Sequence, residues 1–236
     1  MDHIPRGVFI TGTDTGIGKT TASCALLHAL LARRLRAVGM KPVASGCERT
    51  SAGWRNDDAL RLLAASDPQP DYALVNPYAL PDPTAPELAA RDLGIAIELD
   101  PLRAAFDALA ASSDMVVVEG VGGWAAPLSA SLDQVDLARA FEIPVLLVVG
   151  LRLGCISHAR LTARAIRADG LHLVGWIGNA VDADFRRCEE TIAILDRVID
   201  APRLGLLPHC TGTTDATVHS TLLAEAAARV SDLRQG

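Results

Sequence analysis

The sequence predicts an α/β fold in which a mostly parallel, doubly wound sheet carries helices on both faces. Two observations support this prediction. Short runs of β-branched and aliphatic residues, typical of strands buried on both faces, alternate along the chain with longer segments of helical period. The first apolar run also passes through a glycine-rich turn directly into a helix. This alternation of strands and helices is the pattern of one parallel sheet.

Length and composition favour one globular domain. The chain has 236 residues, of which 50% are hydrophobic, so it can bury a sizeable core, and we expect a single domain over residues 1–236. A net charge of -6 argues against a nucleic-acid partner. Since no apolar run has the length of a membrane span and the N-terminus lacks the apolar core of a secretory signal, we expect a cytoplasmic protein with no membrane partner.

The strongest motif follows the apolar strand at residues 8–12, where a glycine-rich turn leads into Gly18-Lys19-Thr20. Such a turn directs backbone N–H groups toward an anion, and the helix that follows adds its positive end. Lys19 can reach the outer phosphates of a nucleotide, and the Thr20 hydroxyl suits Mg²⁺. Five residues rather than four separate Gly12 from Gly18. A plain turn would not account for Gly-Lys-Thr at a helix start, so we expect a P-loop NTPase-like domain.

Lysine is nearly absent from the chain. Of 22 basic residues, 20 are arginine, and the only lysines are Lys19 and Lys41. A coding bias toward arginine is the simplest cause. A compact ammonium nevertheless cannot be replaced by a planar guanidinium where a point charge must fit beside phosphate or carboxylate oxygens. The two lysines are therefore site candidates.

The second strand, expected at residues 37–40 after a helix at 20–35, ends in Lys41 and a proline-glycine turn. Ligands collect at the carboxyl ends of strands in an open parallel sheet, so Lys41 and Ser45 should face the same crevice as the phosphate loop. The alternative is a solvated lysine in a turn.

A polar loop is expected over residues 48–56, and Asp57 and Asp58 should then open a helix that runs to about residue 65. One of the two carboxylates could cap this helix while the other points to the site. The sequence alone leaves open which aspartate does which.

A proline-rich segment over residues 66–86 should contain one short strand at 72–75. Two amphipathic helices, at about 85–93 and 101–111, should then cover one face of the sheet.

A second strong signal is the buried strand at residues 114–118, which ends in Glu119 and is followed by glycines. A carboxylate there can help to hold magnesium, and the glycines allow the backbone to approach phosphates. The alternative is an ordinary strand-end turn. The remaining expected elements are, in order, a strand at 144–150, a helix at 156–168, a strand at 173–179, a helix at 184–199, a strand at 203–206 and a closing helix at 220–233.

Several segments, taken in order, resemble the dethiobiotin synthetase family. They are GTDTGIGKTTASCALL (12–27), MKPVASG (40–46), RNDDAL (55–60), VNPY (75–78), VVEGVGGW (117–124), VVGLRLGCISHARLTA (148–163) and GWIGN (175–179). The longer phosphate loop is itself a feature of that family. The sequence departs from the pattern at Ser157, where the family often carries Asn, and it offers no clear match from residue 182 onward.

The resemblance implies an ATP-dependent enzyme that joins CO₂, supplied as CO₂ or bicarbonate, to 7,8-diaminononanoate and closes the ureido ring of dethiobiotin, the step before biotin. ADP and phosphate are the other products. Every intermediate is an anion beside another anion, so the protein chiefly needs positive charge and positioning. Two alternatives remain: a P-loop switch ATPase of the partition or positioning type, and another cofactor-precursor synthetase.

The resemblance also implies roles for individual residues. Lys41 and Lys19 would be the catalytic pair, and Thr20, Asp58 and Glu119 would hold Mg²⁺. The nucleotide would be bound by Gly16, Ile17, Gly18, Lys19, Thr20, Thr21, Asp58, Glu119, Gly120, Val121, Gly122, Asn179, Ala180, Pro208, His209 and Cys210. The substrate would contact Thr15, Lys41, Ser45, Gly154 and Cys155. The family pattern implies a homodimer in which the helix start at Gly154 receives the carboxylate of the substrate bound to the partner.

Overall fold

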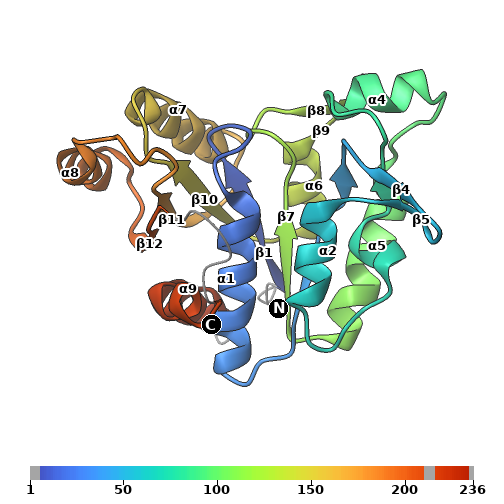
Figure 1. Ribbon diagram of the computed structural model, residues 1–236, viewed down its shortest axis with the longest axis horizontal. Coiled ribbons are helices and arrows are strands. Elements are labelled where there is room, and N and C mark those ends of the chain that lie inside the picture. The colour runs from blue at the N-terminus through green and yellow to red at the C-terminus, as the bar shows by residue number, and fades with distance from the viewer. Residues whose placement is uncertain (1–5, 210–215, 234–236) are drawn as a thin grey trace.

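The computed structural model describes residues 6–209 and 216–233, and a parallel six-stranded sheet runs through its centre (Figure 1). The strands are β1 (Gly7–Gly12), β2 (Ala37–Met40), β7 (Met115–Glu119), β10 (Val145–Gly150), β11 (Leu173–Asn179) and β12 (Arg203–Leu207). They lie in the order β12-β11-β10-β1-β7-β2, and each neighbouring pair is parallel. The predicted sheet is confirmed, and all six carboxyl ends lie at one edge.

Helices cover both faces of this sheet, as predicted. One face carries α1 (Lys19–Ala32), α2 (Asp57–Ala64), α9 (Ala216–Leu222) and α10 (Ala224–Asp232), and the other carries α5 (Leu99–Ser112), α6 (Gln134–Phe141), α7 (Cys155–Ala168) and α8 (Cys188–Val198). Successive side chains of β1 point to opposite faces of the sheet and belong to two different cores. Val8 and Ile10 pack on the α1 face, and Phe9 packs on the other. Burial on both faces explains why the strands are continuous apolar runs.

Aromatic side chains close the second face and attach α6 to it. Phe106 of α5 stacks on Phe141 of α6 with ring centroids 4.5 Å apart, and Phe9 meets Trp124 edge-on at 6.2 Å. Complete burial of one such ring contributes roughly 1.5–3 kcal/mol. The indole N–H of Trp124 also donates to Asp169 Oδ2 at 2.8 Å. The loop that follows β7 is therefore anchored at its far end by a buried ring.

In the part of the chain that the structure describes, three small sheets lie outside the central one. They pair β3 (Val43–Ala44) with β6 (Tyr78–Ala79), β4 (Glu48–Thr50) with β5 (Gly53–Arg55), and β8 (Pro127–Ser129) with β9 (Leu132–Asp133). The β4–β5 hairpin replaces the polar loop expected over residues 48–56, so that prediction is wrong. Gly53, the first residue of β5, has a positive φ of 103°, which glycine adopts without strain. Arg49 lies over the ring of its cross-strand partner Trp54.

The short strand expected at residues 72–75 is a single helical turn, α3 (Tyr72–Val75), and that prediction is wrong. Asp71 caps the turn by accepting the N–H of Ala73 at 3.2 Å. The Tyr72 hydroxyl is held in place because it accepts the Asn56 N–H at 2.9 Å and donates to Asn76 Oδ1 at 3.1 Å. A four-residue apolar segment is too short for its period to separate strand from helix.

Several predicted helices are confirmed within a few residues, and others differ at their ends. Those expected at 85–93, 101–111 and 156–168 are α4 (Pro86–Asp92), α5 and α7. The first helix ends at Ala32, before the predicted residue 35, because Arg34 adopts a left-handed φ of 62°. The helix expected from residue 184 begins only at Cys188, and the closing helix is divided at Leu223 into α9 and α10.

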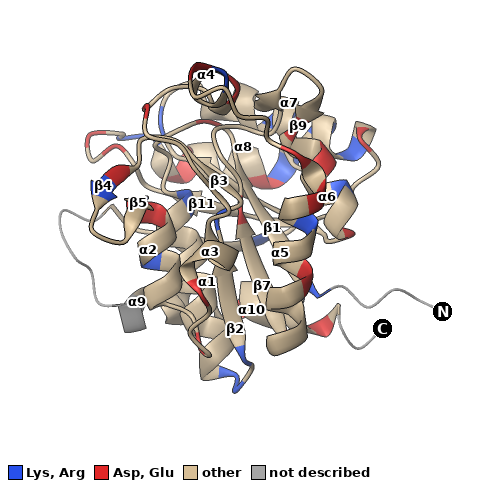
Figure 2. Cartoon of the chain, turned by 90° about the vertical axis from the view of Figure 1, so that its right-hand side faces the viewer, with Lys and Arg blue, Asp and Glu red and all other residues tan. Residues whose placement is uncertain are grey.

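Charged residues are distributed over the surface. On the face shown in Figure 2, acidic and basic residues are interspersed among the described elements and form no continuous basic stripe. Ion pairs such as Arg36 with Asp114 join neighbouring elements at the surface. Within residues 6–209 and 216–233, no helix combines the length and the apolar character that crossing a bilayer requires.

Candidate active site

The phosphate loop, residues 13–18, connects β1 to α1 and depends on glycine at two positions. Gly16 and Gly18 have φ of 71° and 83°, which side-chain-bearing residues rarely adopt. A Cβ on Gly18 would lie 2.0 Å from Asn179 Nδ2, which donates to the Ile17 carbonyl at 2.9 Å. Asn179, at the carboxyl end of β11, therefore packs directly on the loop and fixes its shape.

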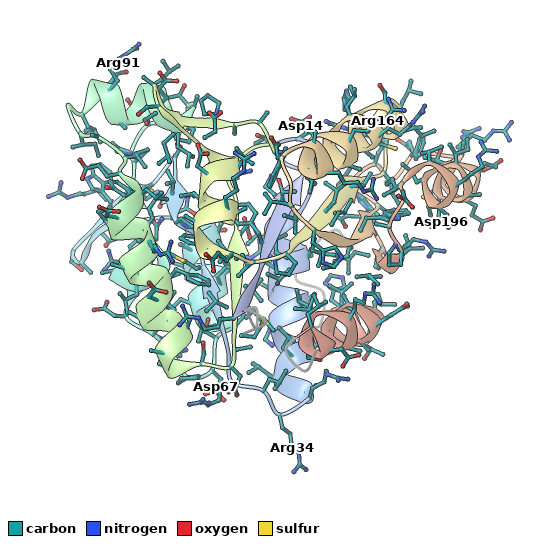
Figure 3. The ribbon with its side chains drawn as sticks, turned by 180° about the vertical axis from the view of Figure 1, so that it is seen from behind. Asp14, Arg34, Asp67, Arg91, Arg164 and Asp196 are labelled. Atoms are coloured by element: carbon teal, nitrogen blue, oxygen red, sulfur yellow. The ribbon has the colours of Figure 1, made fainter. Side chains whose placement is uncertain are left out.

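Asp14 holds the loop closed from within. Its carboxylate accepts the N–H of Thr15 at 2.7 Å and pairs with Arg152, which precedes α7. Its carbonyl accepts a hydrogen bond from Lys19 Nζ at 2.8 Å. Figure 3 labels Asp14 at the carboxyl edge of the sheet and Arg34 at the opposite end of α1. The first lysine is thus folded back over the loop.

The second lysine lies in a buried cluster where four strand and helix ends meet. Lys41 Nζ lies 2.6 Å from Glu119 Oε1, 3.2 Å from Asp58 Oδ2 and 3.3 Å from the Gly120 carbonyl. The Thr20 hydroxyl donates to the same Glu119 oxygen at 2.9 Å. The ends of β2 and β7 and the starts of α1 and α2 therefore meet at one point, as expected for the carboxyl edge of a parallel sheet.

The two lysines have different electrostatic surroundings. Burial lowers the pKa of Lys41, but the adjacent Glu119 and Asp58 carboxylates outweigh burial and raise it above the usual value. Burial also raises the pKa of Asp58, yet Lys41 reverses this and lowers it. For Lys19, burial and the nearby Lys41 charge together lower the pKa to about 8. Lys19 therefore loses its proton more readily than an ordinary lysine, and an anion bound beside it would favour its charged form.

A cavity of about 790 Å³ brings these groups together. The predicted residues that line it are Thr15, Gly16, Gly18, Lys19, Thr20, Thr21, Lys41, Ser45, Asp58, Glu119, Val121 and Gly122. Two buried oxygens at this cavity, Ser45 Oγ and Glu119 Oε2, have no hydrogen-bond partner among the described residues. Buried polar atoms are nearly always paired in proteins, so both oxygens are candidates for ligand contacts.

Asp57 and Asp58, the first two residues of α2, lie in different environments. The expectation that one aspartate caps the helix is wrong, because Asn56 Oδ1 accepts the Ala59 N–H at 3.2 Å and is the cap. Asp58 lines the cavity and contacts Lys41, whereas Asp57 is exposed and does not line the cavity. The choice between the two depends on the direction of the helix, which a local sequence pattern does not give.

A smaller hollow of about 220 Å³ adjoins the other side of the phosphate loop. Its lining contains the predicted residues Gly16, Gly18, Thr21, Asn179, Ala180, Pro208 and His209, and also Val181 and His219. Both cavities share Gly16, Gly18 and Thr21, so the hollow continues from the start of α1. Cys210 lies outside the described residues.

Gly154 and Cys155 lie at the start of α7, and neither lines these two cavities. Gly154 has a left-handed φ of 94°, and Cys155 is buried in the core behind the helix. The preceding Leu153 is 91% exposed. Within one chain, the helix start and the main cavity are therefore separate.

Arg61 and Gln134 are among the residues at the site that were not predicted. Arg61 lines the main cavity one helical turn beyond Asp58 on α2. Gln134, at the start of α6, is fully buried and contacts the loop after β7. Helical spacing from Asp58 could have indicated Arg61. No local signal indicates Gln134, because its contacts join residues far apart in the chain.

A family model described as an AAA domain matches residues 6–217. The solved MinD cell division protein of Aquifex aeolicus has a TM-score of 0.57 and 15% identity, over 95% of this chain and 96% of that one. A ParA family ATPase from Chlorobium tepidum TLS has a TM-score of 0.54 and 13% identity, over 98% and 97%. At these identities the likeness shows the fold alone.

Curated relatives are much more similar in sequence. The ATP-dependent dethiobiotin synthetase BioD of Xanthomonas euvesicatoria pv. vesicatoria (strain 85-10) is 64% identical over 200 residues, which cover 85% of this chain and 89% of the relative. The protein of the same name from Xylella fastidiosa (strain 9a5c) is 59% identical over 215 residues, 91% of this chain and 95% of the relative. The chain belongs to the AAA domain family and to the ATP-dependent dethiobiotin synthetase family.

Proposed function

We propose that this enzyme joins CO₂ to 7,8-diaminononanoate and closes the ureido ring of dethiobiotin, with conversion of ATP to ADP and phosphate. The observation that carries the proposal is the cavity in which the phosphate loop, with Lys19, faces Lys41 and the Ser45 hydroxyl, for which the described residues offer no hydrogen-bond partner. Nucleotide phosphates and an organic substrate could meet there, with both lysines between them.

The reaction needs only the diamine, CO₂ and ATP as reactants. A neutral amine of the substrate attacks CO₂ and gives a carbamate, with loss of one N–H proton to water. A carbamate oxygen attacks the γ-phosphorus, ADP leaves, and the second amine then attacks the carbonyl, loses a proton to water and expels phosphate as the ring closes. Lys19 and Lys41 hold the anions in place and offset their charge, which is the main task of the protein in phosphoryl transfer.

Thr20, Asp58 and Glu119 fit a magnesium ion. All three supply hard oxygen ligands, and the buried Glu119 Oε2 has no hydrogen-bond partner among the described residues. The ion would supply charge neutralisation and orientation to the phosphates. Because Lys41 already contacts Asp58 and Glu119, the metal site and the second lysine share two carboxylates.

The nucleotide would extend from the main cavity into the smaller hollow. We assign the phosphates to Gly16, Ile17, Gly18, Lys19, Thr20 and Thr21, with Glu119, Gly120, Val121 and Gly122 opposite. We assign the base to Asn179, Ala180, Pro208 and His209, and extend this assignment to Cys210 by sequence alone. The hollow of about 220 Å³ beside Gly16 and Thr21 supports this direction.

The substrate would occupy the other half of the main cavity, where Thr15, Lys41 and Ser45 line the wall. Its terminal carboxylate lies at the end of a long aliphatic chain, far from the amines. We propose that a homodimer brings Gly154 and Cys155 of the second subunit to this carboxylate, since the free N–H groups at the start of α7 suit an anion.

Production of dethiobiotin tests the whole assignment. Purified protein incubated with 7,8-diaminononanoate, bicarbonate, ATP and Mg²⁺ should give dethiobiotin, ADP and phosphate in equal amounts, measured by mass spectrometry and phosphate release. ATP hydrolysis that is independent of the diamine would favour a switch ATPase instead.

Loss of a metal ligand should raise the Mg²⁺ requirement. Glu119→Gln and Asp58→Asn should each reduce kcat by about 10- to 100-fold at fixed Mg²⁺, because a neutral amide is a poorer ligand for a hard cation. Asp57→Asn is the matched control and should stay within twofold of the wild type. A Mg²⁺ titration in which Asp57→Asn is the most damaged variant would reverse the assignment within the pair.

A negative charge at the start of α7 should weaken substrate binding only. Gly154→Glu should raise the KM for diaminononanoate about tenfold or more while the KM for ATP stays constant, because like charges repel at the anion site. Gly170→Glu is a matched control, since Gly170 also has a left-handed φ, of 80°, and follows the other end of α7. Full activity of a monomer, established by sedimentation at assay concentration, would contradict the shared site.

A further inference from the structure

The Glu119–Gly123 segment forms one wall of the main cavity, and its backbone leaves the sheet after Gly120. The last pairing bond runs from the Gly120 N–H to the Ile10 carbonyl at 3.0 Å. Beyond it, Val121, Gly122 and Gly123 line the cavity, and Gly122 adopts a left-handed φ of 65°. Backbone groups next to a buried cavity need partners other than a strand.

Gln134 supplies those partners from the first turn of α6. Its Oε1 accepts the Val121 N–H at 2.5 Å, and its Nε2 donates to the Gly123 carbonyl at 2.9 Å. One planar amide thus bonds both sides of Gly122, as a neighbouring strand would. The side chain is 0% exposed, and a Cβ on Gly120 would lie only 2.4 Å from its Oε1.

The same amide also connects this wall to the phosphate loop. Nε2 lies 3.4 Å from the Thr11 hydroxyl of β1, two residues before the loop begins at Thr13. The two loops pack closely, because a Cβ on Gly123 would lie 3.7 Å from the Gly12 carbonyl oxygen. Only a primary amide carries one acceptor and two donors in a single plane, so Glu or Met at this position cannot make the same set.

We propose that Gln134 is a positioning residue that holds the Glu119–Gly123 wall at a fixed distance from the phosphate loop. Through this wall it fixes the Glu119 carboxylate and the Gly120 carbonyl, which both contact Lys41 Nζ. Held in this way before ligands bind, the wall loses little freedom when the nucleotide arrives. Gln134 itself lines neither cavity and touches no reacting atom. The proposal rests on the proposed function only in naming ATP as the ligand between the two loops.

Gln134→Met, which keeps the volume and removes the amide, tests this role. We expect the Kd for Mg²⁺·ATP, measured by calorimetry, to rise about tenfold, and kcat/KM for ATP to fall about 100-fold, since small misplacements at a reacting centre are costly. The KM for diaminononanoate should change much less. Calorimetry reports nucleotide binding even if the protein made no dethiobiotin, so failure of the proposed function would be seen separately.

Ser66→Ala is the matched control. The buried Ser66 hydroxyl accepts the Gly39 N–H at 2.8 Å and donates to the Leu62 carbonyl at 2.7 Å, beyond the end of α2 that is remote from the cavity. Its loss also leaves a buried backbone N–H unpaired, so it should lower Tm but leave the kinetics within twofold.

If Gln134→Met lowers Tm to the same extent and its folded form keeps wild-type nucleotide affinity and kinetics, Gln134 is only a structural residue and the proposal is overturned. Should this variant not fold, Gln134→Asn keeps the amide but shortens its reach, and the same two outcomes decide the question.

Discussion

Lys19→Arg is expected to lose turnover almost as completely as Lys19→Ala, by about 100- to 1,000-fold in kcat, as when a single preorganised charge-stabilising donor is removed. The space around Lys19 explains the severity. Its side chain is 6% exposed, and its ammonium donates to the Asp14 carbonyl at 2.8 Å inside the loop. A planar guanidinium is wider than an ammonium and cannot make this compact contact. Dethiobiotin formation at saturating ATP measures the loss, and circular dichroism should show an unchanged fold.

The pH dependence of ATP binding distinguishes the effect of the charge at position 19 from the effect of the side chain's shape. Because the pKa of Lys19 is lowered to about 8, the ATP-free enzyme loses this charge as the pH rises through 8, whereas arginine stays charged. If charge alone mattered, Lys19→Arg would bind ATP better than the wild type at pH 9. We expect it to bind worse at every pH. Near wild-type turnover of the arginine variant would contradict the claim that a guanidinium cannot replace the Lys19 ammonium.

Long, strongly patterned elements could be predicted from the sequence because their signal is physical and local. Strands buried on both faces must be continuously apolar, which located β1, β7, β10 and β11. The scarcity of lysine indicated two residues that are indeed 6% and 4% exposed at the carboxyl edge of the sheet. Short elements escaped prediction: α3 is a four-residue turn and the strands of the β4–β5 hairpin have three residues each, too few to show a period.

Contacts between distant residues were the other limit. Gln134 reaches Thr11 across 123 positions of the chain, and no local pattern encodes that pairing. The fold itself could not choose between a synthetase and a switch ATPase, since unrelated functions share this architecture. The ordered motifs made that choice. The high identity to dethiobiotin synthetases confirms it.

The second large effect is expected at Lys41, where ATP binding and product formation should separate. Lys41→Gln should leave the Kd for Mg²⁺·ATP within about threefold, since the phosphate loop and Lys19 remain intact. Carbamate formation or its phosphorylation should stop, with kcat reduced by about 100- to 1,000-fold. Equal loss of nucleotide affinity and turnover would instead place Lys41 among the nucleotide contacts.

Stability has to be separated from catalysis in this variant, because Lys41→Gln also leaves Glu119, which is 0% exposed, without its ammonium partner at 2.6 Å. Removing one member of such a buried pair costs about 3–5 kcal/mol of the free energy of unfolding. The double variant Lys41→Gln, Glu119→Gln removes both charges and should recover most of that stability, measured by denaturant unfolding. It should not recover turnover, because the ammonium proposed to face the carbamate is still missing and the proposed metal ligand Glu119 is lost as well. If turnover returned together with stability, Lys41 would be a structural counter-ion for Glu119 and its catalytic role would have to be withdrawn.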